Sequence, residues 1–119
     1  MPIVEIRSYQ LMPGSRDRFH HLVCQQSLPL MLDWGIDVLD FGPSLHDGDG
    51  YFLIRAFRDL AKLEADQAAF YASTAWRNGP REAIVSLIAS DSDIVMAMNH
   101  DRIEALRNSA IAADGPRLD

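Results

Sequence analysis

The sequence holds very little cysteine and very little lysine. Its single cysteine, Cys24, cannot form an internal disulfide, and the apolar stretch around it predicts a small buried hydrophobe. A reducing compartment fits this cysteine content. The single lysine, Lys62, falls on the surface of an expected helix, which argues against Schiff-base chemistry there.

An excess of positive charge is also missing, because the formal net charge is −6. Nucleic acids and anionic lipid surfaces are bound through basic faces, so neither is an expected partner. No apolar run approaches the roughly 20 residues that a membrane-spanning helix needs. The N-terminal segment starts directly as a strand and lacks the charged and apolar regions of a signal peptide. We therefore expect a cytoplasmic protein.

Hydrophobic alternation predicts four strands in a chain of 119 residues, which is long enough for one domain with one core. In the first strand, Glu5, Arg7 and Tyr9 share one face, and the apolar residues between them share the other. The four strands are expected at residues 3–11, 36–41, 51–57 and 93–98. Residues 45–46 are expected to continue the second strand toward the turn DGDG, which makes a hairpin with the third.

Apolar stripes and capping residues predict helices between the strands. The first helix begins after Ser15, and Pro29 inside it predicts a kink or a break near Ser27, because proline removes one amide and crowds the preceding turn. The second helix covers residues 60–72 and is capped by Asp59.

Two short helical pieces are expected in residues 73–90, before the fourth strand. After that strand, Asp101 and Glu104 have the spacing of a capping box, which predicts a short final helix. The chain is therefore divided into a core domain at residues 1–99 and a C-terminal helix with a frayed tail at residues 100–119.

The resulting order of elements is typical of an α+β fold of the ferredoxin-like kind, βαββαβ, with a four-stranded antiparallel sheet and helices on one face. The first and third strands are then neighbours, so Arg7 and Tyr9 share a face with Tyr51 and Arg55. Large aromatic and charged residues together suit neither a water-exposed face nor a dry core. This composition favours a pocket shared with another subunit.

The two arginines of this face, Arg7 and Arg55, are the first candidates for ligand binding. Two guanidiniums in a concave and partly apolar site favour a carboxylate or a similar anion. The alternative is neutralisation inside the protein, by Glu5, Asp40 or Asp93, because buried charges are normally paired.

Four aromatic residues complete the candidate ligand site. Tyr9 can donate a hydrogen bond to a ligand or simply pack, and Tyr51 lies on the same face. Trp34 and Trp76 are expected as core or pocket-wall residues, since no basic groove accompanies them as in nucleic-acid stacking sites.

The motifs for metals and cofactors are incomplete. Asp47 and Asp49 resemble the start of a calcium loop, but Tyr51 and Phe52 stand where an oxygen ligand and a glycine are required. The adjacent histidines His20–His21 point about 100° apart on a helix and cannot chelate one ion together. No histidine lies in the fourth strand or the helical region before it, where a haem ligand would be sought. We expect no metal and no cofactor, and no catalytic residue is identified.

Three segments carry a resemblance to a known family: VEIRSYQLMPGSRDRF, WGIDVLDFGPSLHDGDGYFLIRAF and FYASTAWRNGPREAI. Together they resemble the NIPSNAP family in its short bacterial form, over roughly residues 2–98. The resemblance implies a homodimeric α+β barrel, in which two ferredoxin-like sheets close face to face. The larger superfamily includes cofactor-free monooxygenases and isomerases as well as haem enzymes, whereas NIPSNAP proteins have no settled enzymatic activity.

Three functional hypotheses follow. The first is a homodimer that binds a small hydrophobic or aromatic molecule, with an anionic group admissible, in a pocket between sheet and helices. The second is a cofactor-independent monooxygenase or isomerase that uses Arg7, Arg55 and Tyr9 around its substrate. The third is a structural or adaptor dimer whose sheet face is filled by side chains.

Overall fold

Antiparallel strands form one sheet in the computed structural model, which describes the backbone of residues 1–114 and the side chains of residues 1–109. The strands are β1 (Ile3–Leu11), β2 (Asp37–Pro43), β3 (Gly50–Phe57) and β4 (Ile88–Ala97). Their order across the sheet is β2-β3-β1-β4, so β1 and β3 are the central pair. The predicted ferredoxin-like α+β fold is confirmed.

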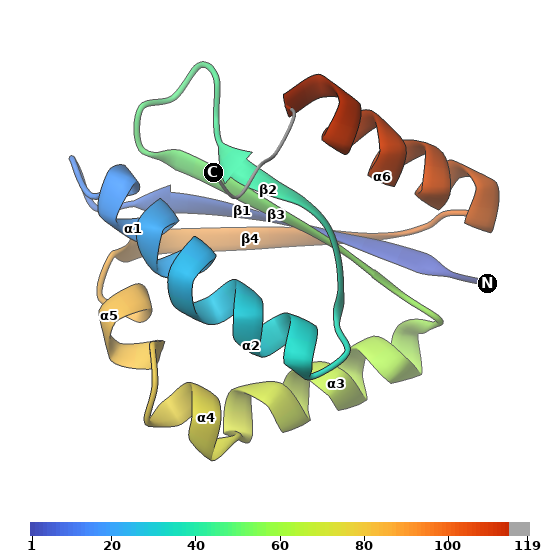
Figure 1. The fold of residues 1–119 in the computed structure, drawn as a ribbon, viewed down its shortest axis with the longest axis horizontal. Coiled ribbons are helices and arrows are strands. Elements are labelled where there is room, and N and C mark those ends of the chain that lie inside the picture. The colour runs from blue at the N-terminus through green and yellow to red at the C-terminus, as the bar shows by residue number, and fades with distance from the viewer. Residues whose placement is uncertain (115–119) are drawn as a thin grey trace.

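Helices cover both faces of the sheet. In Figure 1 the C-terminal helix, α6, lies on one face of the sheet, and the helices that precede it in the chain lie on the other. Those helices are α1 (Arg16–Leu22), α2 (Leu28–Asp33), α3 (Leu60–Ala72), α4 (Thr74–Arg77) and α5 (Arg81–Val85), and α6 is His100–Asp114. The prediction of helices on one face is therefore right for residues 1–99, and α6 adds a partial second layer.

The first helix is interrupted where its sequence predicts. A π-helical turn at Val23–Ser27 separates α1 from α2, directly before Pro29. Proline has no amide hydrogen for the carbonyl four residues earlier, so the preceding turn widens. α2 ends at Asp33, and Gly35 follows its cap residue, Trp34, with a φ of 85° in the left-handed region that glycine adopts without strain.

Three predicted boundaries are wrong. β4 begins at Ile88 rather than Asp93, because residues 88–92 pair with the end of β1, which the local pattern does not reveal. β2 ends at Pro43, so Leu45 and its neighbour lie in the hairpin loop and not in the strand. The cap of α6 is Asn99, whose side-chain oxygen accepts from the Arg102 amide, in place of the capping box at Asp101. Residues 115–119 of the predicted tail lie outside the described residues.

One face of the sheet, here called the mixed face, carries the aromatic and charged side chains of Arg7, Tyr9, Tyr51 and Arg55. It is covered by α1–α5 of the same chain, which corrects the prediction that another subunit shares it. Buried residues of this face, including Tyr9, Tyr51 and Leu53, belong to the main core together with Phe19 of α1 and Phe70 of α3. Both helical crossovers join parallel strands that have one strand between them. Right-handed crossovers of this kind place their helices on one face of a sheet.

The opposite face is only partly covered. Ile103 of α6 packs against Val4 and Ala56 in a second, smaller apolar cluster. Arg107 fixes the helix to β2 by donating from both terminal nitrogens to the Asp37 carboxylate, at 2.7 and 2.9 Å. Farther along this face, on β4, two apolar side chains stay exposed, Ile94 and Met96.

Replacing Ile103 with Ala tests whether α6 is an integral layer. Ile103 is 5% exposed, so the truncation removes buried apolar contacts and leaves a cavity. We expect the free energy of unfolding in urea to fall by about 2–5 kcal/mol. The matched control is Leu60→Ala, at a leucine that is 52% exposed, with an expected change of about 0.5 kcal/mol or less. Equal small changes in the two variants would contradict the packing of α6.

Candidate functional site

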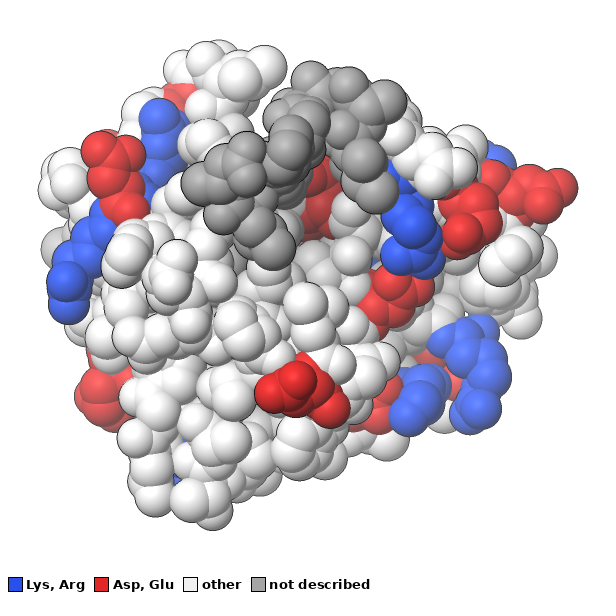
Figure 2. Space-filling view, in the orientation of Figure 1, with Lys and Arg blue, Asp and Glu red and all other residues white. Residues whose placement is uncertain are grey.

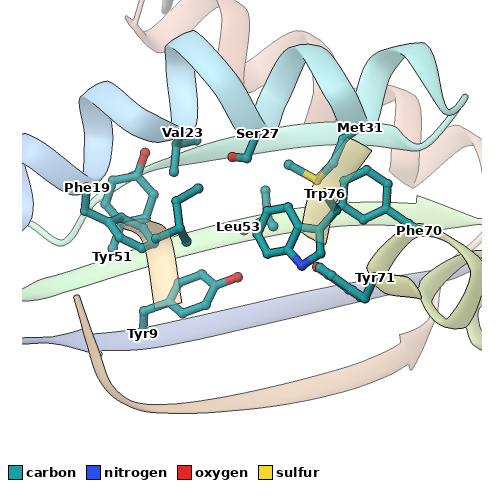
Figure 3. Close-up of a pocket in the computed structure, with 11 residues that line it drawn as sticks. Tyr9, Phe19, Val23, Ser27, Met31, Tyr51, Leu53, Phe70, Tyr71 and Trp76 are labelled. Carbon is teal, nitrogen blue, oxygen red and sulfur yellow. The ribbon is translucent and has the colours of Figure 1, made fainter. Parts of the chain in front are cut away.

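An apolar cavity lies between the mixed face of the sheet and the helices that cover it (Figure 3). Its volume is about 40 Å³, where a single water molecule needs about 10–15 Å³ by the same measure. Eleven residues from both strands and helices line it: Tyr9, Phe19, Val23, Ser27, Met31, Tyr51, Leu53, Phe70, Tyr71, Trp76 and Ile84. The cavity is therefore small, and its walls are mostly aromatic.

The aromatic walls hold one another in place. Phe19 and Tyr51 meet edge to face with ring centroids 5.0 Å apart, and Tyr71 meets Trp76 in the same way at 5.3 Å. The ring centroids of Phe70 and Tyr71 are 5.1 Å apart, also edge to face. Such pairs add stabilisation beyond simple burial and restrict ring movement.

A larger groove, open to solvent, lies beside the cavity. The groove has a volume of about 610 Å³ by the measure used for the cavity, and it lies between β4, α5 and the ends of β1 and α3. Four residues line both spaces: Tyr9, Tyr71, Trp76 and Ile84. The two spaces are therefore neighbours that share these side chains. Three charged residues line the groove but not the cavity: Arg7, Arg81 and Asp91.

A buried ion-pair network lies beside the cavity. Glu5 on β1 and Arg55 on β3 are both fully buried, and Arg55 donates to one Glu5 oxygen from Nε at 2.9 Å and from a terminal nitrogen at 2.6 Å. The other Glu5 oxygen accepts from Gln67 at 2.6 Å and from Arg7 Nε at 3.3 Å. Arg55 also donates to the Tyr71 hydroxyl at 3.3 Å. Arg55 is thus internally paired, as the neutralisation hypothesis proposed, and Glu5 is its partner.

The other two acidic residues considered as partners are placed differently. Asp40 pairs in register with Ile54, on the face turned away from the arginines. Asp93 lies opposite Arg7 across the β1–β4 pairing and is exposed. The described residues include no ion pair within 4 Å between Asp93 and Arg7.

The charge states of this network follow from its contacts. Burial would raise the pKa of Glu5, but the attraction and hydrogen bonds of Arg55, with the charge of Arg7, lower it on balance. Burial and the nearby Tyr71 phenol raise the pKa of Tyr9 to about 12, although Arg7 acts in the opposite direction. Tyr9 is therefore a neutral phenol at physiological pH and can donate a hydrogen bond.

The structure brings most of the predicted ligand residues together. Tyr9, Tyr51 and Trp76 line the cavity, and Arg7 lines the groove. Trp34 does not take part: it is 44% exposed at the end of α2 and contacts Phe70 edge to face.

Several further residues of the site were missed by sequence reasoning. Tyr71 contacts both arginines, since Arg55 bonds to its hydroxyl and the Arg7 guanidinium lies 5.8 Å from its ring centre. Only the three-dimensional packing of α3 against β1 and β3 places it there. His20 Nδ1 lies 2.6 Å from the Tyr51 hydroxyl, so the first of the two adjacent histidines supports the cavity wall.

The described residues include no group of three or more histidine, cysteine, aspartate or glutamate side chains that could hold an ion. None of the helices in that part of the chain is both long and apolar enough to cross a membrane. On the face drawn in Figure 2, lysine and arginine side chains lie among acidic ones and form no continuous basic surface.

Comparison with known proteins identifies the fold. No family model and no curated protein matches the sequence. Among solved structures, a NIPSNAP-like domain protein from Burkholderia xenovorans aligns with a TM-score of 0.75 at 16% identity, over 83% of this chain and 86% of its own. A NIPSNAP family protein from Agrobacterium tumefaciens aligns with a TM-score of 0.76 at 13% identity, over 83% of this chain and 87% of its own.

A third solved structure belongs to a different functional class. It is a candidate antibiotic biosynthesis monooxygenase from Nitrosomonas europaea, with a TM-score of 0.65 at 14% identity, over 83% of this chain and 91% of its own. The resemblance drawn from the sequence is confirmed at the level of structure, because the chain has the fold of NIPSNAP family proteins. At these identities the likeness concerns the fold.

Replacing Glu5 with Gln tests the network. The change leaves Arg55 buried without its counter-ion, so the free energy of unfolding should fall by about 3–5 kcal/mol. The pKa of Glu5 is lower in the folded protein than in the unfolded chain, where it is about 4.3. Its contribution is therefore complete above that value and is lost as pH falls toward the lower, folded-state pKa.

Urea unfolding from pH 7 down to pH 3 measures both effects. The control is Asp66→Asn, which removes the exposed pair of Asp66 with Lys62 and should cost about 0.5 kcal/mol or less. The network would be contradicted if E5Q kept the full acid dependence of the wild type or lost no more stability than D66N.

Proposed function

We propose that the protein is a NIPSNAP-type homodimer of the cytoplasm that binds a small hydrophobic or aromatic molecule between its sheet and α1–α5. The observation that carries the proposal is the aromatic cavity beside a larger groove, with four side chains that line both: Tyr9, Tyr71, Trp76 and Ile84. Ligand sites are typically concave, mostly apolar and supplied with a few polar groups. The cavity is small, so the ligand extends from the cavity into the groove.

A cofactor-independent monooxygenase or isomerase is the second candidate. The likeness to the Nitrosomonas europaea protein supports it, together with Tyr9, a neutral phenol at the wall of an apolar cavity. Under this hypothesis Tyr9 donates a hydrogen bond to the reacting group. Conversion of a bound compound that stops in Tyr9→Phe, with binding retained, would favour the enzyme over the binding protein. A scaffold dimer without a ligand is the remaining alternative.

Filling the cavity separates a binding protein from a scaffold. Ser27 is buried and lines the cavity, and Ser27→Leu adds apolar volume to its wall. We expect at least a tenfold loss of affinity for small aromatic compounds that bind the wild type, measured by calorimetry. The control is Gln26→Leu, at the exposed neighbouring position. Unchanged affinity in S27L, or no binding by the wild type, would favour the scaffold.

The proposal of a homodimer rests on the apolar part of the sheet that α6 does not cover. Ile94 is 63% exposed and Met96 is 38% exposed on the face that α6 leaves free, beside Ile6 and Ile54. Exposed apolar surfaces of this kind favour association between subunits. We expect light scattering to show a dimer for the wild type and a monomer for Ile94→Asp. The control Leu45→Asp, at a fully exposed loop leucine, should stay dimeric.

A further inference from the structure

The two arginines beside the cavity, Arg55 and Arg7, differ in how far they are exposed to solvent. Arg55 is fully buried, and its guanidinium is used by Glu5 and by the Tyr71 hydroxyl. The side chain of Arg7 is 20% exposed, and it approaches Glu5 only through Nε at 3.3 Å among the described contacts. The single negative charge of Glu5 is therefore shared by two guanidiniums, which leaves one positive charge without a full counter-ion. Because Arg55 makes the closer contacts with Glu5, this uncompensated charge lies at Arg7, which lines the groove.

The lining of the groove adds to this imbalance. Arg81 at the start of α5 is a second cation of the groove, and Asp91 on β4 is its acidic member. Arg81 also forms an exposed ion pair with Glu82, which water screens and which is therefore weak. Asp93 is exposed on β4 opposite Arg7 without an ion pair to it in the described part of the chain.

The position of Arg7 relates this charge to the cavity. Arg7 lies over the ring of Tyr71, which lines both the cavity and the groove. A guanidinium at this boundary is partly shielded from water, and it matches the planar geometry of a carboxylate. A molecule that reaches from the cavity into the groove would bring its outer end to Arg7.

We propose that the ligand is a small monocarboxylic acid with an aromatic or branched apolar body, whose carboxylate binds Arg7 in the groove while its body packs against Tyr71 and Trp76, the side chains that the groove shares with the cavity. Arg81 contributes a weaker, longer-range attraction from the opposite wall. Arg55 takes no part in binding the anion, because its charge is matched by Glu5. This assignment rests on the proposed binding function and adds the chemical class and the orientation of the ligand.

Matched acid and amide probes test the assignment. Phenylacetate and phenylacetamide have the same shape and differ in charge. Binding is measured by calorimetry and by the NMR signal of the Trp76 indole N–H, which reports on the cavity wall. We expect phenylacetate to bind at least tenfold more tightly than phenylacetamide at low salt, with an affinity that falls as salt is added. The amide affinity should not depend on salt.

Variants of the groove assign the effect to a residue. Arg7→Gln should lower the affinity for the acid to that for the amide, and Arg7→Lys should keep a reduced preference for the acid because its charge remains. Arg81→Gln should weaken acid binding two- to threefold. Arg77→Gln, an exposed arginine of α4 outside the groove lining, should change nothing. Thermal unfolding checks that each variant folds, and the R7K and salt results decide if R7Q does not fold.

Each outcome has a distinct meaning. Equal binding of acid and amide by the wild type would overturn the monocarboxylate assignment and leave the apolar binding function standing. An acid preference that survives in R7Q would overturn the role of Arg7. If neither probe binds or moves the Trp76 signal, the proposed binding function fails, and the assignment fails with it.

Discussion

The buried ion pair between Glu5 and Arg55 is the constraint around which the rest of the structure is arranged. The two residues are direct partners across the central strands β1 and β3, and both are fully buried. Charges removed from water in this way require complete pairing, and the carboxylate obtains it from Arg55, Gln67 and Arg7. The network thereby fixes the register of the central strands and the position of α3 over them.

The same network shapes the site. Because Arg55 and Glu5 neutralise each other, the interior beside the cavity can remain apolar and aromatic. Arg7, which shares the carboxylate only partly, lies at the border between the cavity and the groove. Tyr71 links the two regions, since it bonds to Arg55 and also forms part of the cavity wall. On β1, a carboxylate of the buried ion pair, Glu5, therefore lies two residues from a partly exposed charge, Arg7.

The two faces of the sheet serve different purposes in this arrangement. The face with Arg7 and Arg55 is closed by α1–α5 and contains the cavity, so the proposed ligand lies within one chain. The other face is covered by α6 at β2 and β3 and carries exposed apolar residues on β4. The proposed ligand site and the proposed subunit contact thus lie on opposite sides of the same four strands, and variants can perturb one without the other.

The sequence by itself determined the strands, most helix starts and the shared face of Arg7, Tyr9, Tyr51 and Arg55, because alternation, capping and proline effects depend on near neighbours. It also determined the break before Pro29, for the same reason. Only the tertiary structure decided which layer covers that face, where β4 begins, and that Glu5 rather than Asp40 or Asp93 neutralises Arg55. The contributions of Tyr71 and Gln67 belong to this second group. These features depend on contacts between residues distant in the chain, and local patterns do not encode which distant partners meet.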